Sequence, residues 1–271
     1  MAPTTALLTI LVVGVVAQND LTSNVTKWAD LRIVRGQNAQ LGQFPWQAWI
    51  ECIRFNFLAT GCGGSLITTS HILTAAHCVD SVVLCQVSLG LISLKERGYS
   101  YFLHPNNMII HGNYQADSYS NDIAIIRLRS SVKLTENIQP IRLAKEFQNS
   151  RTLSGMPAIV SGWGKTRDSE KGRHQLLQYG TVRIMPEAKC IPFFKRMFNL
   201  SITSGHICTD FSASNVCNGD SGGPLAIIEP DNIWTLIGII SLGVTPCEEG
   251  IPSVFTAVAN YLPWIYNNTQ K

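Results

Sequence analysis

After residue 32 the chain alternates short apolar runs with Gly, Asn, Asp and Ser, and this pattern most constrains its fold. Each run has the length of a strand and is too short for a core helix. The clearest runs are residues 65–69, 72–74, 82–89, 123–128, 158–162, 178–184, 224–228 and 235–241. Many short strands at this spacing predict an all-β barrel or sandwich. Helix is minor, and the clearest candidate is the C-terminal stretch 258–268.

Composition excludes three classes of protein. Only 14% of the 271 residues are charged and the net charge is +3, so the chain lacks the high charge of disordered proteins. The 21 Lys and Arg residues are scattered, whereas nucleic-acid binders gather them into patches. A membrane span needs about 18 consecutive apolar residues, and the longest run, residues 6–17, is shorter.

The N-terminus and the cysteines both predict secretion. The short apolar run 6–17 ends in the small residue Ala17, which is typical of a signal peptide (1–17) that is cut after this residue. The even number of cysteines indicates an oxidising compartment, although eight cysteines allow on the order of a hundred pairings. A zinc site is the alternative, but it favours close C-x₂-C pairs, which do not occur in the sequence. The cysteines are Cys52, Cys62, Cys78, Cys85, Cys190, Cys208, Cys217 and Cys247.

Three Asn-x-Ser/Thr sequons are candidate glycan sites in a secreted chain. Their acceptor residues are Asn24, Asn199 and Asn267.

Three further segments carry the residue types of nucleophilic catalysis. They are residues 74–78 around His77, residues 121–124 around Asp122, and residues 219–224 around Ser221. Taken alone, each segment has a purely structural explanation. A histidine beside a cysteine is usually structural, an aspartate before a strand is usually a turn residue, and a glycine-rich segment is usually a flexible turn. Together they supply a hydroxyl nucleophile, the imidazole base that it needs, and a carboxylate to fix the tautomer of that base.

The chain order His, Asp, Ser separates this set from two other serine hydrolase classes, since subtilisin and α/β-hydrolases use different orders. An esterase of another fold is a poor alternative, because its Gly-x-Ser-x-Gly motif lies in a strand–helix unit and helices are scarce here.

From Ile33 to the C-terminus the sequence resembles the chymotrypsin-like serine proteases of the trypsin superfamily. The resemblance implies a chymotrypsin-like fold, with two six-stranded antiparallel β-barrels and a C-terminal α-helix. Residues 137–143 are typical of arthropod members. The motifs that carry the resemblance, besides the three catalytic segments, are residues 33–36, 44–47, 62–66, 161–164 and 263–265.

The resemblance also implies roles for the catalytic residues. Ser221 is the nucleophile, His77 the general base and acid, and Asp122 the residue that orients and stabilises the imidazolium. The backbone N–H groups of Gly219 and Ser221 form the oxyanion hole, where glycine leaves room for the oxyanion. Ser241 matches the position whose backbone meets the substrate and whose hydroxyl touches the catalytic aspartate.

By the same resemblance the chain is a zymogen. Cleavage after Arg32 would free an α-ammonium on Ile33, and this charge would pair with the buried Asp220. The expected organisation is a signal peptide (1–17), a propeptide (18–32) and a protease domain (33–271), with barrels at about 33–147 and 148–271. The enzyme is not expected to cut well after Arg, so a separate trypsin-like protease would activate it.

Family pairing further implies three disulfides and leaves Cys52 and Cys85, which are then paired with each other. The three disulfides are Cys62–Cys78, Cys190–Cys208 and Cys217–Cys247.

The specificity pocket, placed by the resemblance, has Asn215 at its floor and Gly243 and Ser253 in its walls. Without a charge at the floor, Lys and Arg substrates lose their counter-ion, so the prediction is a chymotrypsin-like preference for Phe, Tyr, Leu or Met. The amide leaves open a preference for Asn, Gln or His. A broad collagenolytic or elastase-like specificity is the alternative.

We therefore expect a secreted, monomeric endopeptidase without cofactor or metal. Its partners would be protein or peptide substrates, the activating protease and protein protease inhibitors, but neither nucleic acid nor a membrane. A non-catalytic binding protein on the same fold is the rival hypothesis, but such homologues usually lose a member of the triad.

Overall fold

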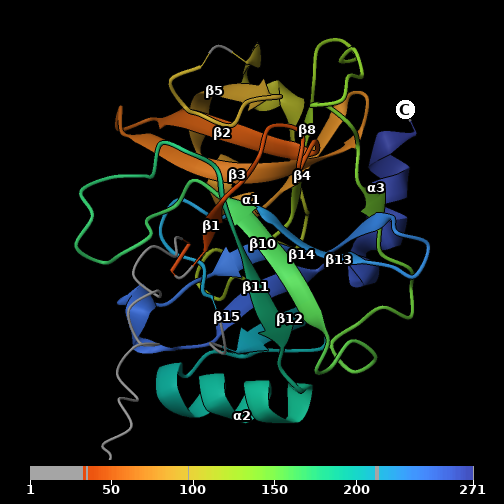
Figure 1. The fold of residues 1–271 in the computed structure, drawn as a ribbon. Helices are drawn as coiled ribbons and strands as arrows, with labels where there is room; N and C mark the ends of the chain where they lie inside the picture. The colour runs from red at the N-terminus through yellow and green to blue at the C-terminus, as the bar shows by residue number, and fades with distance from the viewer. Residues whose placement is uncertain (1–32, 35, 97, 211–213, 271) are drawn as a thin grey trace, which may run out of the picture. The chain divides into compact units, whose positions relative to one another are not determined.

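The computed structural model describes residues 33–34, 36–96, 98–210 and 214–270 (Figure 1). The expected signal peptide (1–17) and propeptide (18–32), with Asn24 and Arg32, lie outside the described residues. Among the described residues, no helix is long and apolar enough to cross a membrane.

Seven strands form the first lobe, the upper sheet in Figure 1, in the order β6-β5-β2-β3-β4-β8-β7. The chain passes from β6 to β7 through a single 3₁₀ turn, η1 (Pro105–Asn107), and these two strands occupy the two edges of the sheet. Pro105 lacks an N–H and cannot continue a ladder, so one strand is broken into two halves that close the sheet. The strands are β2 (Gln47–Arg54), β3 (Ala59–Thr68), β4 (His71–Thr74), β5 (Val82–Leu89), β6 (Tyr99–Leu103), β7 (Met108–Ile110) and β8 (Ala124–Arg127).

The sheet of the second lobe closes into a barrel through pairing of its first and last strands. Its strands follow the order β11-β10-β13-β14-β15-β12, and β12 pairs back with β11. Two short strands from the N-terminal part of the chain join this sheet: β1 pairs with β11, and β9 runs parallel to β14. The strands are β1 (Gln37–Asn38), β9 (Arg142–Leu143), β10 (Pro157–Gly162), β11 (Gln178–Ile184), β12 (His206–Asp210), β13 (Pro224–Ile228), β14 (Trp234–Leu242) and β15 (Ser253–Ala257).

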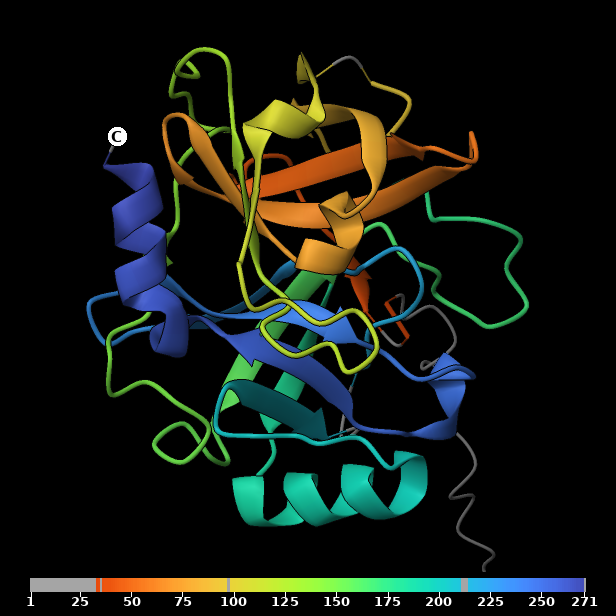
Figure 2. The ribbon, with the colours of Figure 1, turned by 180° about the vertical axis from the view of Figure 1, so that it is seen from behind.

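With β6 and β7 counted as one broken strand, each lobe is a six-stranded antiparallel barrel, and the predicted chymotrypsin-like fold is confirmed. The predicted C-terminal helix is present as η3 (Val258–Tyr261) followed by α3 (Leu262–Thr269). From behind, α3 stands beside the first lobe (Figure 2). There the ring of Trp264 packs 5.2 Å from that of His111, between centroids, which ties the C-terminus to the first lobe.

A second helix was not expected from the sequence. The helix α2 (Glu187–Phe198) follows Pro186 and contains Pro192, and prolines inside an apolar stretch argue against a helix. Pro186 is the N-cap and precedes the helix, whereas Pro192 lies in its second turn. The buried Phe194 and the disulfide of Cys190 hold α2 against the second lobe despite this proline.

Four disulfides join the cysteines of the described chain. The pairs are Cys52–Cys85, Cys62–Cys78, Cys190–Cys208 and Cys217–Cys247.

Candidate active site

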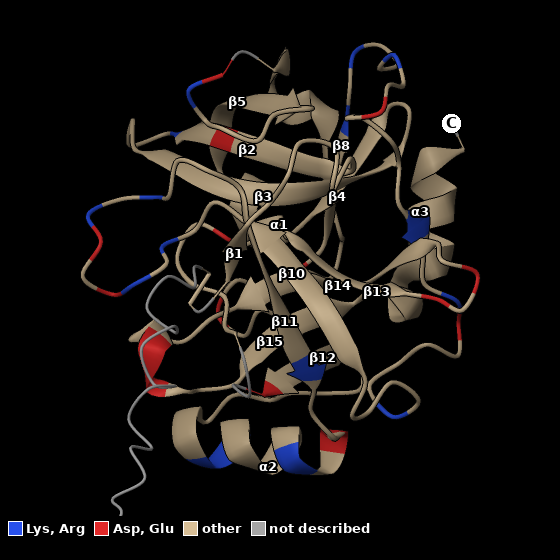
Figure 3. Cartoon of the chain, in the orientation of Figure 1, with Lys and Arg blue, Asp and Glu red and all other residues tan. Residues whose placement is uncertain are grey.

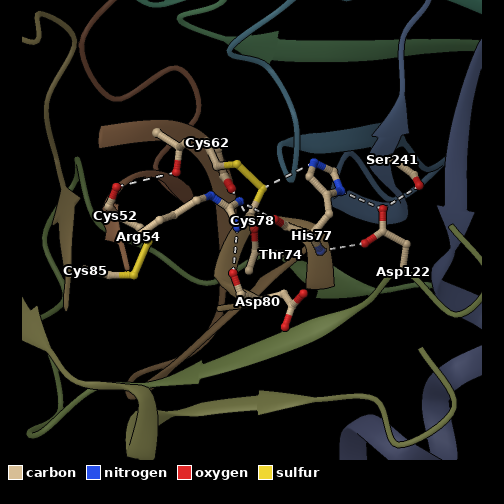
Figure 4. The surroundings of a disulfide bond; sticks show 12 residues. Cys52, Arg54, Cys62, Thr74, His77, Cys78, Asp80, Cys85, Asp122 and Ser241 are labelled. Atoms are coloured by element: carbon tan, nitrogen blue, oxygen red, sulfur yellow. Dashed lines mark hydrogen bonds and ion pairs between the residues drawn. A yellow bond between two sulfur atoms is a disulfide. The ribbon is translucent and has the colours of Figure 1, made fainter. Parts of the chain in front are cut away.

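His77 and Asp122 meet because the strands that precede and follow them pair. His77 lies in the single turn α1 (Ala76–Val79) just after β4, and Asp122 lies just before β8. The two strands are antiparallel neighbours, with Thr74 opposite Ala124 at this end. The Asp122 Oδ2 lies 2.8 Å from the His77 Nδ1, and its Oδ1 accepts the His77 backbone N–H at 2.9 Å (Figure 4). One carboxylate therefore fixes both the ring and the backbone of the histidine.

Asp122 is completely buried, and hydrogen bonds hold both its carboxylate and its backbone carbonyl. The Ser241 hydroxyl donates to Oδ2 at 2.6 Å, while the Thr256 hydroxyl donates to the Asp122 carbonyl at 2.8 Å. Burying a carboxylate costs free energy unless it is hydrogen-bonded, and the Ser241 hydroxyl and the His77 backbone N–H supply donors here. The pKa values of Tyr114 and Tyr261 are raised to about 12, mainly by burial and secondly by the charge of Asp122. Both phenols near Asp122 therefore stay neutral.

Ser221 sits in a glycine-rich turn that packs against the first lobe. The Gly63 N–H of β3 donates to the Ser221 carbonyl at 2.7 Å, which joins the two lobes at the nucleophile. Gly219 and Gly222 have φ of 103° and 77°, in the left-handed region that favours glycine. A Cβ at Gly222 would also collide with the Thr74 hydroxyl. The conformation of this turn therefore needs these glycines.

His77 and Ser221 line one cavity of about 250 Å³ between the lobes. Its wall includes Ser241 and Gly243, so the structure brings four of the predicted site residues together. The full lining is His77, Tyr119, Val216, Cys217, Asn218, Ser221, Ile240, Ser241, Leu242, Gly243 and Cys247.

Asp220 points away from this cavity into the core of the second lobe. It is fully buried, and its carboxylate accepts the N–H groups of Gly164 and Cys217 at 2.7 and 2.9 Å. Burial raises the pKa of Asp220 to about 6. A Cβ at Gly162 or Gly164 would collide with the carboxylate, so both positions require glycine. In the sequence, residues 161–164 mark the family resemblance, and the space that Gly162 and Gly164 leave for Asp220 is visible only in the fold.

Ile33 and Val34 are also buried, at the start of the described chain. The Asn215 N–H donates to the Val34 carbonyl at 3.2 Å, and the two residues form an isolated bridge. The N-terminal segment is thereby joined directly to the residue beneath the pocket.

Asn215 and Ser253 lie behind the cavity rather than in its lining. They are 2% and 1% exposed, and the Ser253 hydroxyl donates to the Asn215 Oδ1 at 2.5 Å. The Asn215 Nδ2 donates to the carbonyls of Cys247 and Ile251 at 3.2 and 3.1 Å, and its Oδ1 also accepts the Val216 N–H. Every donor and acceptor of the amide is therefore satisfied within the protein.

Residues 165–175 form a charged loop that is held by contacts at both of its ends. The Asp168 carboxylate accepts the N–H groups of Cys247 and Glu248 at 2.8 and 3.1 Å, so the loop supports one wall of the cavity. At its other end the Arg173 guanidinium stacks 4.7 Å from the Trp49 ring centroid and donates to Glu51 at 2.6 Å. The contacting residues are 80 and 122 positions apart in the sequence, so local sequence patterns do not predict these contacts.

Among the residues that the structure describes, two groups of side chains lie close enough to surround a metal ion. They are Cys62, His77 and Cys78, and Asp168, Cys217 and Cys247. All four cysteines are in disulfides and offer no thiolate, which removes the ligands that a metal would need here.

Comparison with known proteins agrees with this geometry. The family model described as Trypsin matches residues 33–265. The chain is 34% identical to fibrinolytic enzyme, isozyme C, of Lumbricus rubellus, over 88% of this chain and 100% of that protein. It is also 34% identical to a collagenase of Hypoderma lineatum, over 88% of this chain and 87% of that protein. The solved structure of HL collagenase superposes with a TM-score of 0.77, at 34% identity, over 88% of this chain and 99% of the other.

The chain thus belongs to the trypsin family of serine proteases.

Proposed function

We propose that the protein is a secreted serine endopeptidase in which Ser221 attacks the substrate carbonyl and His77 carries the proton. The observation that supports this most is the buried Asp122 carboxylate against the His77 Nδ1 at 2.8 Å. This contact keeps a proton on Nδ1 and leaves Nε2 as the base for the Ser221 hydroxyl. His77 then protonates the leaving amine, and water releases the acyl group from Ser221 by the same route.

The N–H groups of Gly219 and Ser221 would stabilise the oxyanion that forms during both steps. The positive φ of Gly219 supports this role, because it sets the orientation of the turn that carries both groups. Ser241 would hold the substrate backbone while its hydroxyl keeps Asp122 in place.

Activation by cleavage after Arg32 is part of the proposal. Ile33 and Val34 are buried, and Asp220 is a buried carboxylate whose described partners are two uncharged backbone N–H groups. An α-ammonium on Ile33 would supply the missing positive charge. Treatment with trypsin should therefore switch on activity, with an N-terminus that reads Ile33-Val34-Arg35. Another N-terminus in the active enzyme, or efficient autoactivation that requires Ser221, would contradict this.

The raised pKa of Asp220 predicts how the intact chain responds to pH. Because the folded pKa of about 6 exceeds the unfolded value of about 3.9, the folded protein binds this proton more tightly. The contribution of Asp220 to the free energy of unfolding therefore falls by about 3 kcal/mol as pH rises from about 4 to above 6. We compare the uncleaved S221A variant with the uncleaved S221A/D220N double variant. The double variant lacks the Asp220 carboxyl, so its free energy of unfolding should rise relative to that of S221A as pH increases. Thermal melts from pH 4 to 7 measure the difference.

The same comparison has an internal control. After cleavage at Arg32, the Ile33 ammonium would favour the charged form of Asp220, so D220N should lose stability relative to its parent as pH rises. A difference that is independent of pH in both forms would count against the proposed role of Asp220.

For specificity we propose a preference for large apolar residues before the scissile bond. The satisfied amide of Asn215 supports this, because it has no free donor or acceptor for a polar substrate side chain. Two relatives are named as a collagenase and a fibrinolytic enzyme, so a broader collagenolytic activity is the second candidate. Profiling the activated enzyme on a peptide library distinguishes the two.

A negative charge at position 215 should not create a trypsin-like enzyme. In N215D the new oxygen would face the carbonyl oxygens of Cys247 and Ile251, at the places now 3.2 and 3.1 Å from the amide nitrogen. We expect a loss of stability of about 3 kcal/mol or more, and no efficient cleavage after Lys or Arg. N218D, which adds the same charge at an exposed residue of the cavity rim, is the control for stability. Efficient cleavage of Arg substrates by N215D would refute this account of the pocket.

Two of the three sequons lie on the surface of the described protein, and secretion would make them available for glycosylation. Asn199 ends α2 and Asn267 lies in α3, and both are exposed. We propose them as glycan sites, together with Asn24.

A further inference from the structure

Arg54 is the last residue of β2 and one of three charged residues in the described strands of the first lobe. The other two are Glu51 and Arg127, and most of the remaining charges lie in loops and on α2 (Figure 3). Glu51 is paired with Arg173, and Arg127 is exposed at the end of β8. Arg54 is half-buried, and among the described residues it forms no ion pair with a carboxylate. A cation in this position needs other partners to offset the cost of its burial.

The partners of the Arg54 guanidinium are two carbonyl groups of the turn that carries His77. Its Nη2 donates to the His77 carbonyl at 2.8 Å, and its Nη1 donates to the Asp80 carbonyl at 2.7 Å (Figure 4). The last carbonyls of a helical turn lack partners within the turn, and α1 is only four residues long. Because a guanidinium presents its donors in a planar fork, Arg54 holds both carbonyls in one fixed arrangement.

His77 is therefore held by a charged side chain at each end of its main chain. The Asp122 carboxylate accepts the His77 N–H at 2.9 Å, and its other oxygen lies 2.8 Å from Nδ1. Arg54 holds the carbonyl end from a different strand. The disulfide Cys62–Cys78 tethers the next residue, but its rotatable bonds do not set the orientation of the turn. The guanidinium supplies the directional contact that keeps the turn from tilting about Asp122.

The backbone of Arg54 is itself fixed, as a support for another residue requires. The disulfide Cys52–Cys85 joins β2 to β5 two residues earlier. The pairing register of these strands shifts just before Arg54, and such an irregularity redirects the side chain beside it. The Arg54 N–H donates to the Leu58 carbonyl at 3.0 Å, and the Phe57 N–H donates to the Arg54 carbonyl at 2.9 Å, which closes the hairpin between β2 and β3.

The position of His77 matters because its Nε2 would exchange a proton with Ser221 and with the leaving amine in turn. A displacement of a catalytic group by about 1 Å lowers a rate by up to about a hundredfold. Arg54 contacts the His77 carbonyl and does not line the cavity of the active site. Its loss should therefore slow the chemical steps and leave substrate binding nearly unchanged.

We propose that Arg54 is a positioning residue for the general base. Its guanidinium fixes the main chain of His77, and it thereby sets the turnover of the enzyme without touching the substrate. This inference rests on the proposed function and deepens it, because it adds a second charged residue, on the opposite side of His77 from Asp122, to the machinery of proton transfer.

The test measures kcat and KM of the activated enzyme on a peptidyl nitroanilide. R54A should lower kcat about tenfold or more and leave KM within about twofold of the wild type. R54K keeps the charge but not the planar fork, so its kcat should lie between those of R54A and the wild type. Since Arg54 is half-buried, ethylguanidinium should reach the vacated space in R54A and raise kcat about threefold in a saturable manner.

Arg183 supplies the matched control. It lies on β11 in the second lobe, and its Nη1 donates to the Gly155 carbonyl at 2.7 Å, so R183A also removes a hydrogen bond from an arginine to a backbone carbonyl. R183A should stay within about twofold of the wild type and should not respond to ethylguanidinium. The wild type with the same additive measures any inhibition at the specificity pocket.

A kcat of R54A within about twofold of the wild type overturns the inference. A loss that neither R54K nor ethylguanidinium reduces overturns it as well, because Arg54 would then serve stability alone, and so does a loss that falls mainly on KM. If R54A does not fold, R54K decides: a lower kcat with unchanged KM and Tm supports the positioning role, and an unchanged kcat overturns it. If the activated wild type leaves the nitroanilide intact, the proposed function itself fails.

Discussion

Ser221→Ala should lower kcat about a million-fold while leaving the fold intact. The hydroxyl is the group that would form the acyl-enzyme, and neither His77 nor water in the same cavity replaces it at a comparable rate. The stability of the turn depends on backbone contacts of Ser221 and its glycine neighbours, which alanine keeps. Turnover of a nitroanilide after activation by trypsin, together with a thermal melt, measures both effects.

The Ser221→Ala variant also separates an enzyme from a binding protein on the same fold. An organophosphonate serine inhibitor should label the activated wild type and leave the variant unlabelled. Equal labelling of both proteins, or turnover that survives the substitution, would show that another residue is the nucleophile.

Asp122→Asn should lower kcat by about ten-thousand-fold. The new amide has one acceptor where the carboxylate has two, and it must serve the His77 N–H, the His77 Nδ1 and the Ser241 hydroxyl, which lie 2.9, 2.8 and 2.6 Å away. If the amide nitrogen faces the His77 backbone N–H, two donors oppose each other. If it faces the His77 Nδ1, that atom must accept a hydrogen bond, so the ring proton moves to Nε2. The base that Ser221 needs is lost with it.

Asp80→Asn is the matched control for this substitution. Asp80 ends α1, and its carbonyl, which the substitution keeps, accepts the Arg54 guanidinium. The D80N variant should stay within about twofold of the wild type, because a carboxyl group at this surface position contributes little. Similar losses in D80N and D122N would mean that the effect comes from charge near His77 and not from the tautomer of the ring.

Local sequence was enough to locate most strands. Residues 82–89, 178–184 and 224–228 are strands with the predicted bounds, since β-branched runs between turn residues match a half-buried sheet. The helix α2 was missed because Pro186 and Pro192 argue against a helix, while packing of Phe194 and the disulfide of Cys190 override that local preference.

Some residues of the candidate site could likewise be identified from the sequence, and others only from the structure. The motifs identified His77, Asp122 and Ser221 as residue types and in chain order, since a weak nucleophile needs both partners. The roles of Asp168, which supports the cavity wall, and of Arg173, which anchors the same loop, could not be found from the sequence, because each contacts a segment distant in sequence.

The sequence by itself determined the family, the strands and the identity of the chemical groups, because these depend on residue type, short-range periodicity and ordered motifs. Tertiary structure alone decided how the groups are used. It placed hydrogen-bond partners on every donor and acceptor of the Asn215 amide, held the charged loop against the cavity wall, and left Phe57 exposed at the end of the β2–β3 hairpin. The physical reason is that hydrogen-bond saturation, burial and exposure are properties of contacts between distant segments, and they exist only once both barrels have closed.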